Sequence, residues 1–152
     1  MKPFTPIILC VLFSFVGQVT AQCNTGRITQ GLANTLAGNT VCGTGAGPQN
    51  TGDHWQEFHD GQGNNSPLIE WARGTDPIDP TRQVGTWAAP NGNSTTSTVT
   101  YNYTGGDTYI FAVYNNGNGT YSFCDGVGAS GGGTEQAIAR LQSGQGACTS
   151  FP

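Results

Sequence analysis

The sequence predicts a mainly all-β protein: an antiparallel up-and-down meander of about seven or eight strands that closes into a small barrel, with short N- and C-terminal helices packed on it. Short runs rich in β-branched and aromatic residues follow one another, and Gly, Asn and Pro turn signals separate them at intervals of about ten to fifteen residues. Residues 108–114 carry apolar side chains on both faces, which predicts a strand covered on both sides. We expect the meander to close, because an open sheet edge invites aggregation.

Residues 1–21 are expected to be a secretory signal peptide. Lys2 precedes an apolar run over residues 7–16, and Val19 and Ala21 are the small residues that a cleavage site requires. The apolar run is about ten residues long, well short of the ~20 that cross a bilayer as a helix. The rest of the chain has the size of one domain and is predicted to be soluble and either secreted or periplasmic, without a membrane span.

The charge balance argues against a nucleic acid or an anionic membrane surface as partner. Removal of residues 1–21 takes away the only lysine, and four arginines then stand against nine acidic residues, which gives a net charge of −5. A protein that binds nucleic acid needs a cationic stripe to displace counterions from the phosphates. This chain has none.

Residues 25–37 are predicted to form the first element, a helix. Ile28, Leu32 and Leu36 recur every four residues, as they do along one face of a helix. Gly38 stands where such a helix would end. The apolar stripe would pack on the larger structure that follows.

The strands are predicted to follow in order, each bounded by turn-forming residues. They comprise residues 39–42, 54–59, 68–73, 83–88, 95–104, 108–114 and 120–124.

The C-terminal part is predicted to lie outside the sheet. A glycine-rich linker over 126–133 leads into residues 134–141, where Ile138 and Leu141 share one side of a predicted short helix. The predicted organisation is therefore a barrel domain with its N-terminal helix over 22–125, and a linker with a helical tail, tied on by a disulfide, over 126–152.

Four cysteines remain after the signal segment, and they predict two disulfides. Cys23, Cys42, Cys124 and Cys148 lack the Cys-x-x-Cys pairing of metal sites, and exported proteins oxidise their cysteines. Pairing Cys23–Cys42 and Cys124–Cys148 would pin each terminal segment to its neighbouring strand, whereas Cys42–Cys124 would join the first and last strands. The sequence does not choose among the three possible connectivities.

Three tryptophans are the first candidates for a binding site. Trp55, Trp71 and Trp87 are spaced sixteen residues apart, one on each of three consecutive predicted strands. Neighbouring strands would bring the rings together inside the barrel, where they could hold sugars or flat apolar ligands. Glu57 and Tyr109 complete the predicted ligand-binding set. Large aromatic residues also fill cores, so the same rings could simply pack there.

The strand that contains both histidines raises an alternative chemistry. Glu57 and His59 share one face, and Glu70 lies on the next predicted strand, so the three could perform acid–base catalysis or hold a metal. A polar face directed to solvent explains the same pattern. His54 points to the opposite face from His59. The common catalytic and phosphate-binding motifs are missing from the sequence, and we predict no catalytic residue, no metal and no cofactor.

Short sequence patterns resemble known proteins. The pentapeptide QVGTW at 83–87 resembles the Gly-x-Trp strand of lipocalin- and avidin-like (calycin) barrels, a resemblance that implies a ligand-sized barrel. The order LAGNTVCG, a Trp-x-Glu strand, GTW and GTYSFC resembles small secreted bacterial proteins of unassigned function over most of the chain after residue 21. Neither resemblance assigns a binding residue.

The sequence therefore favours a secreted, non-catalytic binding protein whose aromatic-lined barrel holds a small apolar or sugar-like ligand, or a protein. A secreted hydrolase or metal-dependent enzyme using Glu57, His59 and Glu70 is one alternative. A structural surface or matrix subunit is the other, suggested by the low charge and the abundant Gly, Asn and Thr. The oligomeric state is not predicted.

Overall fold

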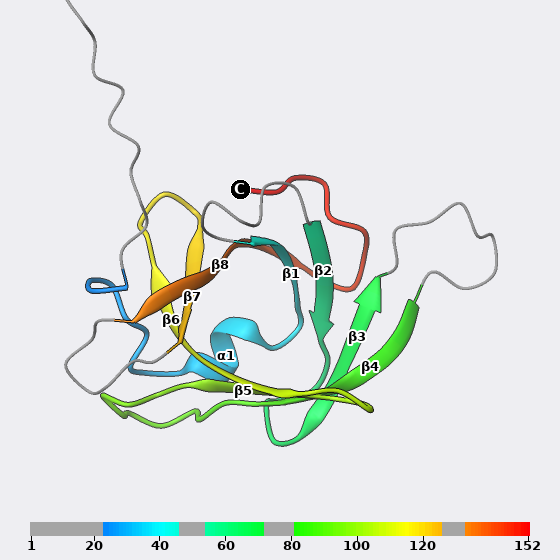
Figure 1. The fold of residues 1–152 in the computed structure, drawn as a ribbon, viewed down its shortest axis with the longest axis horizontal. Helices are drawn as coiled ribbons and strands as arrows, with labels where there is room; N and C mark the ends of the chain where they lie inside the picture. The colour runs from blue at the N-terminus through cyan, green and yellow to red at the C-terminus, as the bar shows by residue number, and fades with distance from the viewer. Residues whose placement is uncertain (1–22, 46–53, 72–80, 126–132) are drawn as a thin grey trace, which may run out of the picture.

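The protein is a closed antiparallel barrel of eight strands, as the sequence predicts (Figure 1). A computed structural model describes residues 23–45, 54–71, 81–125 and 133–152. The strands are β1 Asn39–Gly45, β2 His54–His59, β3 Ser66–Trp71, β4 Thr81–Ala88, β5 Val99–Tyr103, β6 Thr108–Asn115, β7 Tyr121–Asp125 and β8 Thr134–Ser143. Each strand pairs with its neighbours in sequence, and β1 pairs with β8 to close the ring. The predicted signal segment and the linker residues 126–132 lie outside the described residues.

The predicted N-terminal helix is much shorter than residues 25–37. Helix α1 spans only Leu32–Leu36, and Gly31 before it adopts a left-handed conformation with φ 61°. Residues 26–28 instead run along the part of β6 that β5 does not reach: the Asn115 amide donates to the Gly26 carbonyl at 2.8 Å, and the Ile28 amide to the Val113 carbonyl at 2.9 Å. The helix prediction is wrong for these residues because their backbone groups complete the sheet.

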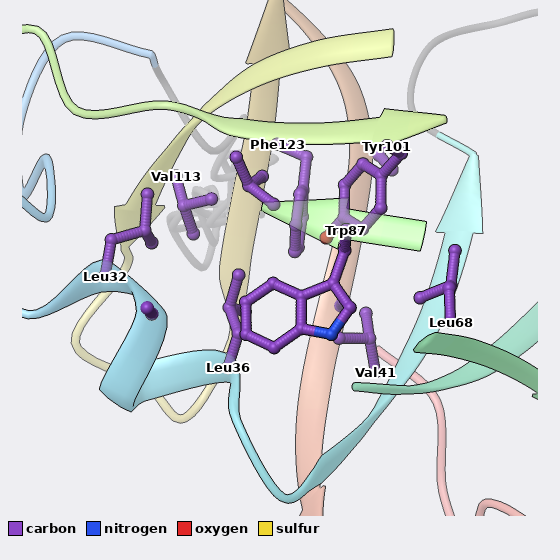
Figure 2. Packing of buried hydrophobic residues seen from close by; sticks show 12 residues of the cluster. Leu32, Leu36, Val41, Leu68, Trp87, Tyr101, Val113 and Phe123 are labelled. Atoms are coloured by element: carbon purple, nitrogen blue, oxygen red, sulfur yellow. The ribbon is translucent and has the colours of Figure 1, made fainter. Parts of the chain in front are cut away.

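Helix α1 closes one end of the barrel, as Figures 1 and 2 show. Leu32 and Leu36 are fully buried and pack with Trp87, which is also fully buried (Figure 2). The Trp87 indole N–H donates to the backbone carbonyl of Asp60, 2.8 Å away, in the turn between β2 and β3. In the same turn, Gly63 has φ 75° and lies against the Trp87 ring, so that a Cβ there would overlap it. Helix α1, the turn between β2 and β3, and Trp87 together fill this end of the barrel.

The C-terminal segment is a strand of the barrel and not a helical tail. Residues 134–143 form β8, which pairs with β7 on one side and with β1 on the other. Ala137, Ala139 and Leu141 alternate along its inner face and belong to the core or pack against it. The helix prediction is wrong because two small alanines make this alternation inconspicuous, while Ile138 and Leu141 alone mimic a helical spacing. The barrel therefore continues past residue 125 to Ser143.

Strand β6 is covered on both faces over only half of its length. Ala112, Val113 and Tyr114 are buried, as predicted, but Tyr109 is 45% exposed and Ile110 is 55% exposed. The N-terminal segment covers the outer face only from residue 112 onward, where Cys23 packs with Ala112 and Tyr114. The prediction of two covered faces is therefore wrong for the end of the strand farthest from α1.

The two disulfides join each terminal segment to a distant strand. Cys23 pairs with Cys124 on β7, and Cys42 on β1 pairs with Cys148, with sequence separations of 101 and 106 residues. This is the third possible connectivity, in which neither bond is local. The C-terminal segment is also held by Gln56, whose side-chain oxygen accepts from the Cys148 amide at 2.7 Å. Both tails are therefore fastened to the outside of the closed sheet.

The long loops that the disulfides close predict a large effect on stability. Replacing Cys42 and Cys148 by alanine should lower the free energy of unfolding by about 3–5 kcal/mol, because the unfolded chain regains the entropy of an open loop. Equilibrium urea unfolding measures the change, and the Cys23→Ala/Cys124→Ala double variant is the matched comparison. Peptide mapping that finds Cys23 linked to Cys42, or an unchanged unfolding midpoint, would contradict this prediction.

Candidate functional site

The barrel contains a cavity of about 580 Å³ at the end opposite α1, next to the turn between β5 and β6. Six of its eleven lining residues are aromatic. The lining residues are Trp55, Glu57, Tyr101, Tyr103, Gly106, Asp107, Tyr109, Phe111, Phe123, Gln136 and Ala137. A volume of this size is typical of sites that hold small molecules.

The aromatic side chains of the cavity contact one another in a continuous series. Tyr103 meets Tyr109 edge-on at 5.8 Å between ring centroids, and Tyr109 stacks on Phe111 at 6.2 Å. Phe123 follows with its edge 6.3 Å from Phe111, and its other neighbour is Trp55 at 6.5 Å. Because each ring is held by the next, the series forms a stable apolar wall.

Small residues on β1 and β8 lie next to two of the aromatic rings. Gly43 on β1 lies beside Trp55, and a Cβ at this position would overlap the indole ring. Ala139 pairs with Gly43 across β1 and β8, and Ala137 pairs with Gly45. Gly43 thus makes room for the Trp55 ring, and Ala137 contributes only a methyl group to the cavity wall.

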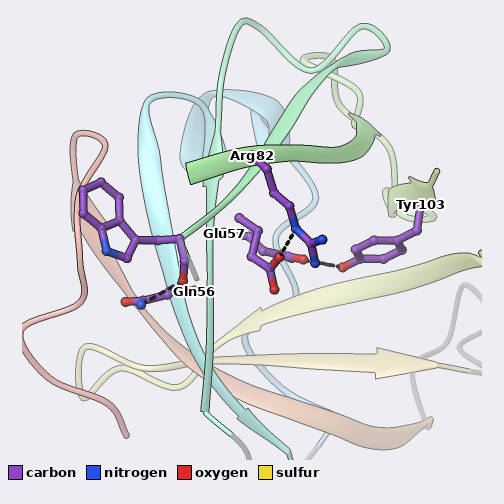
Figure 3. Close-up of polar contacts among 6 residues, drawn as sticks. Gln56, Glu57, Arg82 and Tyr103 are labelled. Atoms are coloured by element: carbon purple, nitrogen blue, oxygen red, sulfur yellow. Dashed lines mark hydrogen bonds and ion pairs between the residues drawn. The ribbon is translucent and has the colours of Figure 1, made fainter. Parts of the chain in front are cut away.

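Glu57 brings a buried carboxyl group to the cavity. Its side chain is directed toward Tyr103, whose hydroxyl lies 2.8 Å and 3.0 Å from the two carboxylate oxygens (Figure 3). One hydroxyl carries one proton, so it satisfies only one of these oxygens at a time. Burial raises the pKa of Glu57 to about 7; the Tyr103 hydrogen bond acts in the lowering direction, and the nearby Glu70 acts in the raising direction.

A second cavity of about 390 Å³ begins on the other side of the same pair. Glu57 and Tyr103 line both cavities, and the second is otherwise lined by Glu70, Arg82, Gln83, Val84 and Thr104. Arg82 Nε lies 2.8 Å from Glu70 Oε2, in an ion pair with a largely exposed arginine. Such an exposed pair contributes little to stability.

His59 and Tyr101 form a neutral polar pair in the middle of the barrel. The His59 Nε2 atom lies 2.9 Å from the Tyr101 hydroxyl, and the imidazole meets the Trp87 ring edge-on at 4.9 Å. Burial lowers the pKa of His59 to about 3 and raises that of Tyr101 well above its ordinary value. At neutral pH both side chains are therefore uncharged, and their hydrogen bond separates the filled end of the barrel from the hollow end.

The structure brings together three of the five side chains that the sequence predicts as ligand-binding. Trp55, Glu57 and Tyr109 line the larger cavity. Trp87 is instead part of the core beneath α1, and Trp71 lines neither cavity. The Trp71 side chain lies on the outer face because Glu70 pairs with Glu57 inside the barrel and neighbouring residues alternate.

The sequence reasoning missed most of the aromatic wall. Tyr101, Tyr103, Phe111 and Phe123 all line the cavity. The signal that could have found them is the aromatic residue at every second position on both arms of the hairpin around Gly106, because alternate residues of a strand share a face.

The three residues of the enzyme alternative do not converge on one point. Glu57 and Glu70 are cross-strand partners and both line the second cavity, but His59 lines neither cavity. Within the described ranges, no group of three His, Cys, Asp or Glu side chains lies close enough to hold a metal ion.

Comparisons with models of protein families, with curated proteins and with solved structures found no match to this chain. None of the helices in the described part of the chain is long and apolar enough to cross a membrane. The function is therefore inferred from the cavity itself.

His59 and Glu57 should contribute to the pH dependence of stability with opposite signs. The pKa of His59 is lowered by folding, so its contribution falls by on the order of 3 kcal/mol as the pH drops from 6.5 to 4. The pKa of Glu57 is raised by folding, so its contribution falls by on the order of 3 kcal/mol as the pH rises from 4.5 to 7. The two effects oppose each other between pH 4.5 and 6.5.

Single variants should separate the two contributions in urea unfolding between pH 4 and 8. Glu57→Gln should lose stability on acidification more steeply than the native protein, because only the histidine effect remains. His59→Gln should gain stability when the pH falls from 7 to 5. Three identical pH profiles would show that neither group titrates as its burial implies.

Proposed function

We propose that the protein is a secreted, non-catalytic binding protein that holds a small ligand with an apolar or aromatic body in the barrel cavity. The observation that carries this proposal is the cavity of about 580 Å³ with six aromatic side chains in its wall. Flat ring faces offer contact area and little hydrogen bonding. They therefore favour a ligand with an apolar or aromatic part over a fully polar ligand.

The rigidity of the surrounding barrel supports binding. Every strand has two hydrogen-bonded neighbours, and the two disulfides fasten the terminal segments to β1 and β7. A preformed cavity loses little conformational freedom when a ligand enters, and this favours affinity. The polar groups in the wall, such as Glu57, Asp107 and Gln136, would orient a ligand while the aromatic rings hold it.

Among the described residues around the larger cavity, no nucleophile or acid–base pair converges on one point, and this supports a non-catalytic role. His59 is bonded to Tyr101 below the cavity, and its pKa of about 3 makes it a poor proton acceptor at neutral pH. Glu57 is the buried carboxyl group at the cavity wall, and its described hydrogen-bond partner is the Tyr103 hydroxyl.

A neutral fluorescent probe tests the proposal directly. N-phenyl-1-naphthylamine should increase its emission on binding to the purified protein, because the cavity excludes water from the rings. Ala137→Phe should weaken this binding at least tenfold, because the new ring points into the cavity from β8. Ile110→Phe adds the same ring on the exposed outer face of β6 and should leave the affinity unchanged.

The proposal is tested by comparing the probe affinities of Ala137→Phe and Ile110→Phe. Thermal melting of each variant controls for folding. No emission change with the native protein, or equal affinities for Ala137→Phe and the native protein, would show that the cavity is not a binding site.

We also propose that residues 1–21 are removed during export and that the mature chain begins at Gln22. Two disulfides are typical of proteins in oxidising compartments, and Cys23 is bonded to Cys124. Intact-mass analysis of the exported protein should give a chain that starts at Gln22 with four cysteines oxidised. A chain that retains the apolar run over residues 7–16 would refute this processing.

A further inference from the structure

Among the described residues, the wall of the larger cavity has acidic groups but no basic one. Glu57 and Asp107 are the carboxyl groups in this part of the wall, and the eleven described lining residues include no Lys, Arg or His. The nearby cation, Arg82, lines the second cavity and forms an ion pair with Glu70. A ligand that enters the aromatic cavity therefore meets negative charge that the protein does not neutralise there.

The Glu57 carboxylate keeps an unused capacity to accept hydrogen bonds. The residue is only 8% exposed, and the Tyr103 hydroxyl is the donor that reaches its two oxygens, at 2.8 Å and 3.0 Å. A buried carboxylate normally accepts several hydrogen bonds or pairs with a cation, since burying an unpaired charge is costly. The remaining acceptor sites point to a donor that the described part of the protein does not supply.

The aromatic wall favours the same kind of ligand. The faces of Trp, Tyr and Phe rings carry partial negative charge and attract an ammonium group, with Trp the strongest of the three. Trp55 and Tyr103 both line the cavity together with Glu57. An ammonium group beside the carboxylate would thus lie in a cavity whose wall contains these rings, while an aromatic body would contact Phe111 and Phe123.

We infer that the ligand of this cavity is a cationic aromatic amine, whose ammonium group pairs with Glu57 and whose ring packs against the aromatic wall. This inference rests on the proposed binding function of the cavity and adds the charge of the ligand. An anion would be repelled by the same two carboxyl groups, and a neutral molecule would leave the carboxylate unpaired.

Binding should depend on pH through Glu57. Its ionised form is favoured above pH 7, so the affinity for an amine should rise as the pH increases from 6 to 8, and binding at pH 6 should release close to one proton. The titratable or charged groups around Glu57 lie on strands β2 to β6 and on the turn between β5 and β6. They are His59, Glu70, Arg82, Tyr101, Tyr103, Asp107 and Tyr109. His59 is neutral in this range, and Glu57 is a buried carboxyl group whose pKa lies within it.

Three ligands with one ring system and different charges test the inference. Tryptamine is a cation, tryptophol is its neutral alcohol, and indole-3-propionate is an anion of similar size. Isothermal titration calorimetry at pH 8 should show tryptamine binding at least tenfold more tightly than tryptophol, and indole-3-propionate more weakly than both. At pH 6 the tryptamine affinity should fall about tenfold, while that of tryptophol should not change.

Glu57→Gln is the decisive variant, because it removes the charge and keeps the shape of the side chain. It should reduce the tryptamine affinity at least tenfold and leave tryptophol binding within about threefold. Glu135→Gln is the matched control: it removes a carboxylate on β8 that does not line the cavity, and it should change neither affinity.

The outcomes separate this inference from the proposed function. If tryptophol binds as tightly as tryptamine, or if Glu57→Gln binds tryptamine as the native protein does, the ligand is not selected by charge and the inference is wrong. If none of the three ligands binds but N-phenyl-1-naphthylamine does, the inference is also wrong, and the binding function stands. If that probe fails as well, both are overturned.

Discussion

The structure depends on one constraint: each strand of the sheet must have a hydrogen-bonded neighbour on both sides. Strand β8 meets this need for β1 and β7, and closes the barrel. The same constraint explains the N-terminal segment. Strand β5 pairs with the first half of β6 only, and residues 26–28 supply partners to the second half. Unpaired edges would recruit other chains, so closure also protects the protein from aggregation.

Closure creates an interior whose two ends are packed differently. At one end α1, the turn between β2 and β3, and Trp87 fill the barrel. At the other end Gly43 makes room for the Trp55 ring, and Ala137 contributes only a methyl group to the cavity wall. A core of native density would need larger side chains there.

The sequence predicts the class of fold well, because strand alternation and turn residues are local signals. The sequence-based prediction is wrong where the secondary structure or the direction of a side chain depends on strand register or on a partner distant in sequence. Residues 134–143 become a strand because β1 and β7 both need a neighbour, although Ile138 and Leu141 have helical spacing. Trp71 faces outward because Glu70 faces inward, and that choice depends on pairing with β2. Of the cavity residues, Trp55, Glu57 and Tyr109 were predicted. The alternating aromatic residues on β5 and β6 carry a local signal as well, but their meeting with Phe123 on β7 in one wall depends on the pairing of β6 with both strands.

The two buried ionisable residues of β2 differ in a way that supports the proposed binding site at the hollow end. His59 and Glu57 are two residues apart on the same face, and both are buried. His59 is neutral and satisfied by Tyr101, so it behaves as an ordinary component of the core. Glu57 keeps a carboxyl group whose pKa is near 7, next to space that an apolar side chain could help to fill. Replacing a buried charge by an apolar residue of similar volume is often neutral or stabilising. A carboxyl group at this position therefore does little for folding, which supports the proposal that it serves ligand binding.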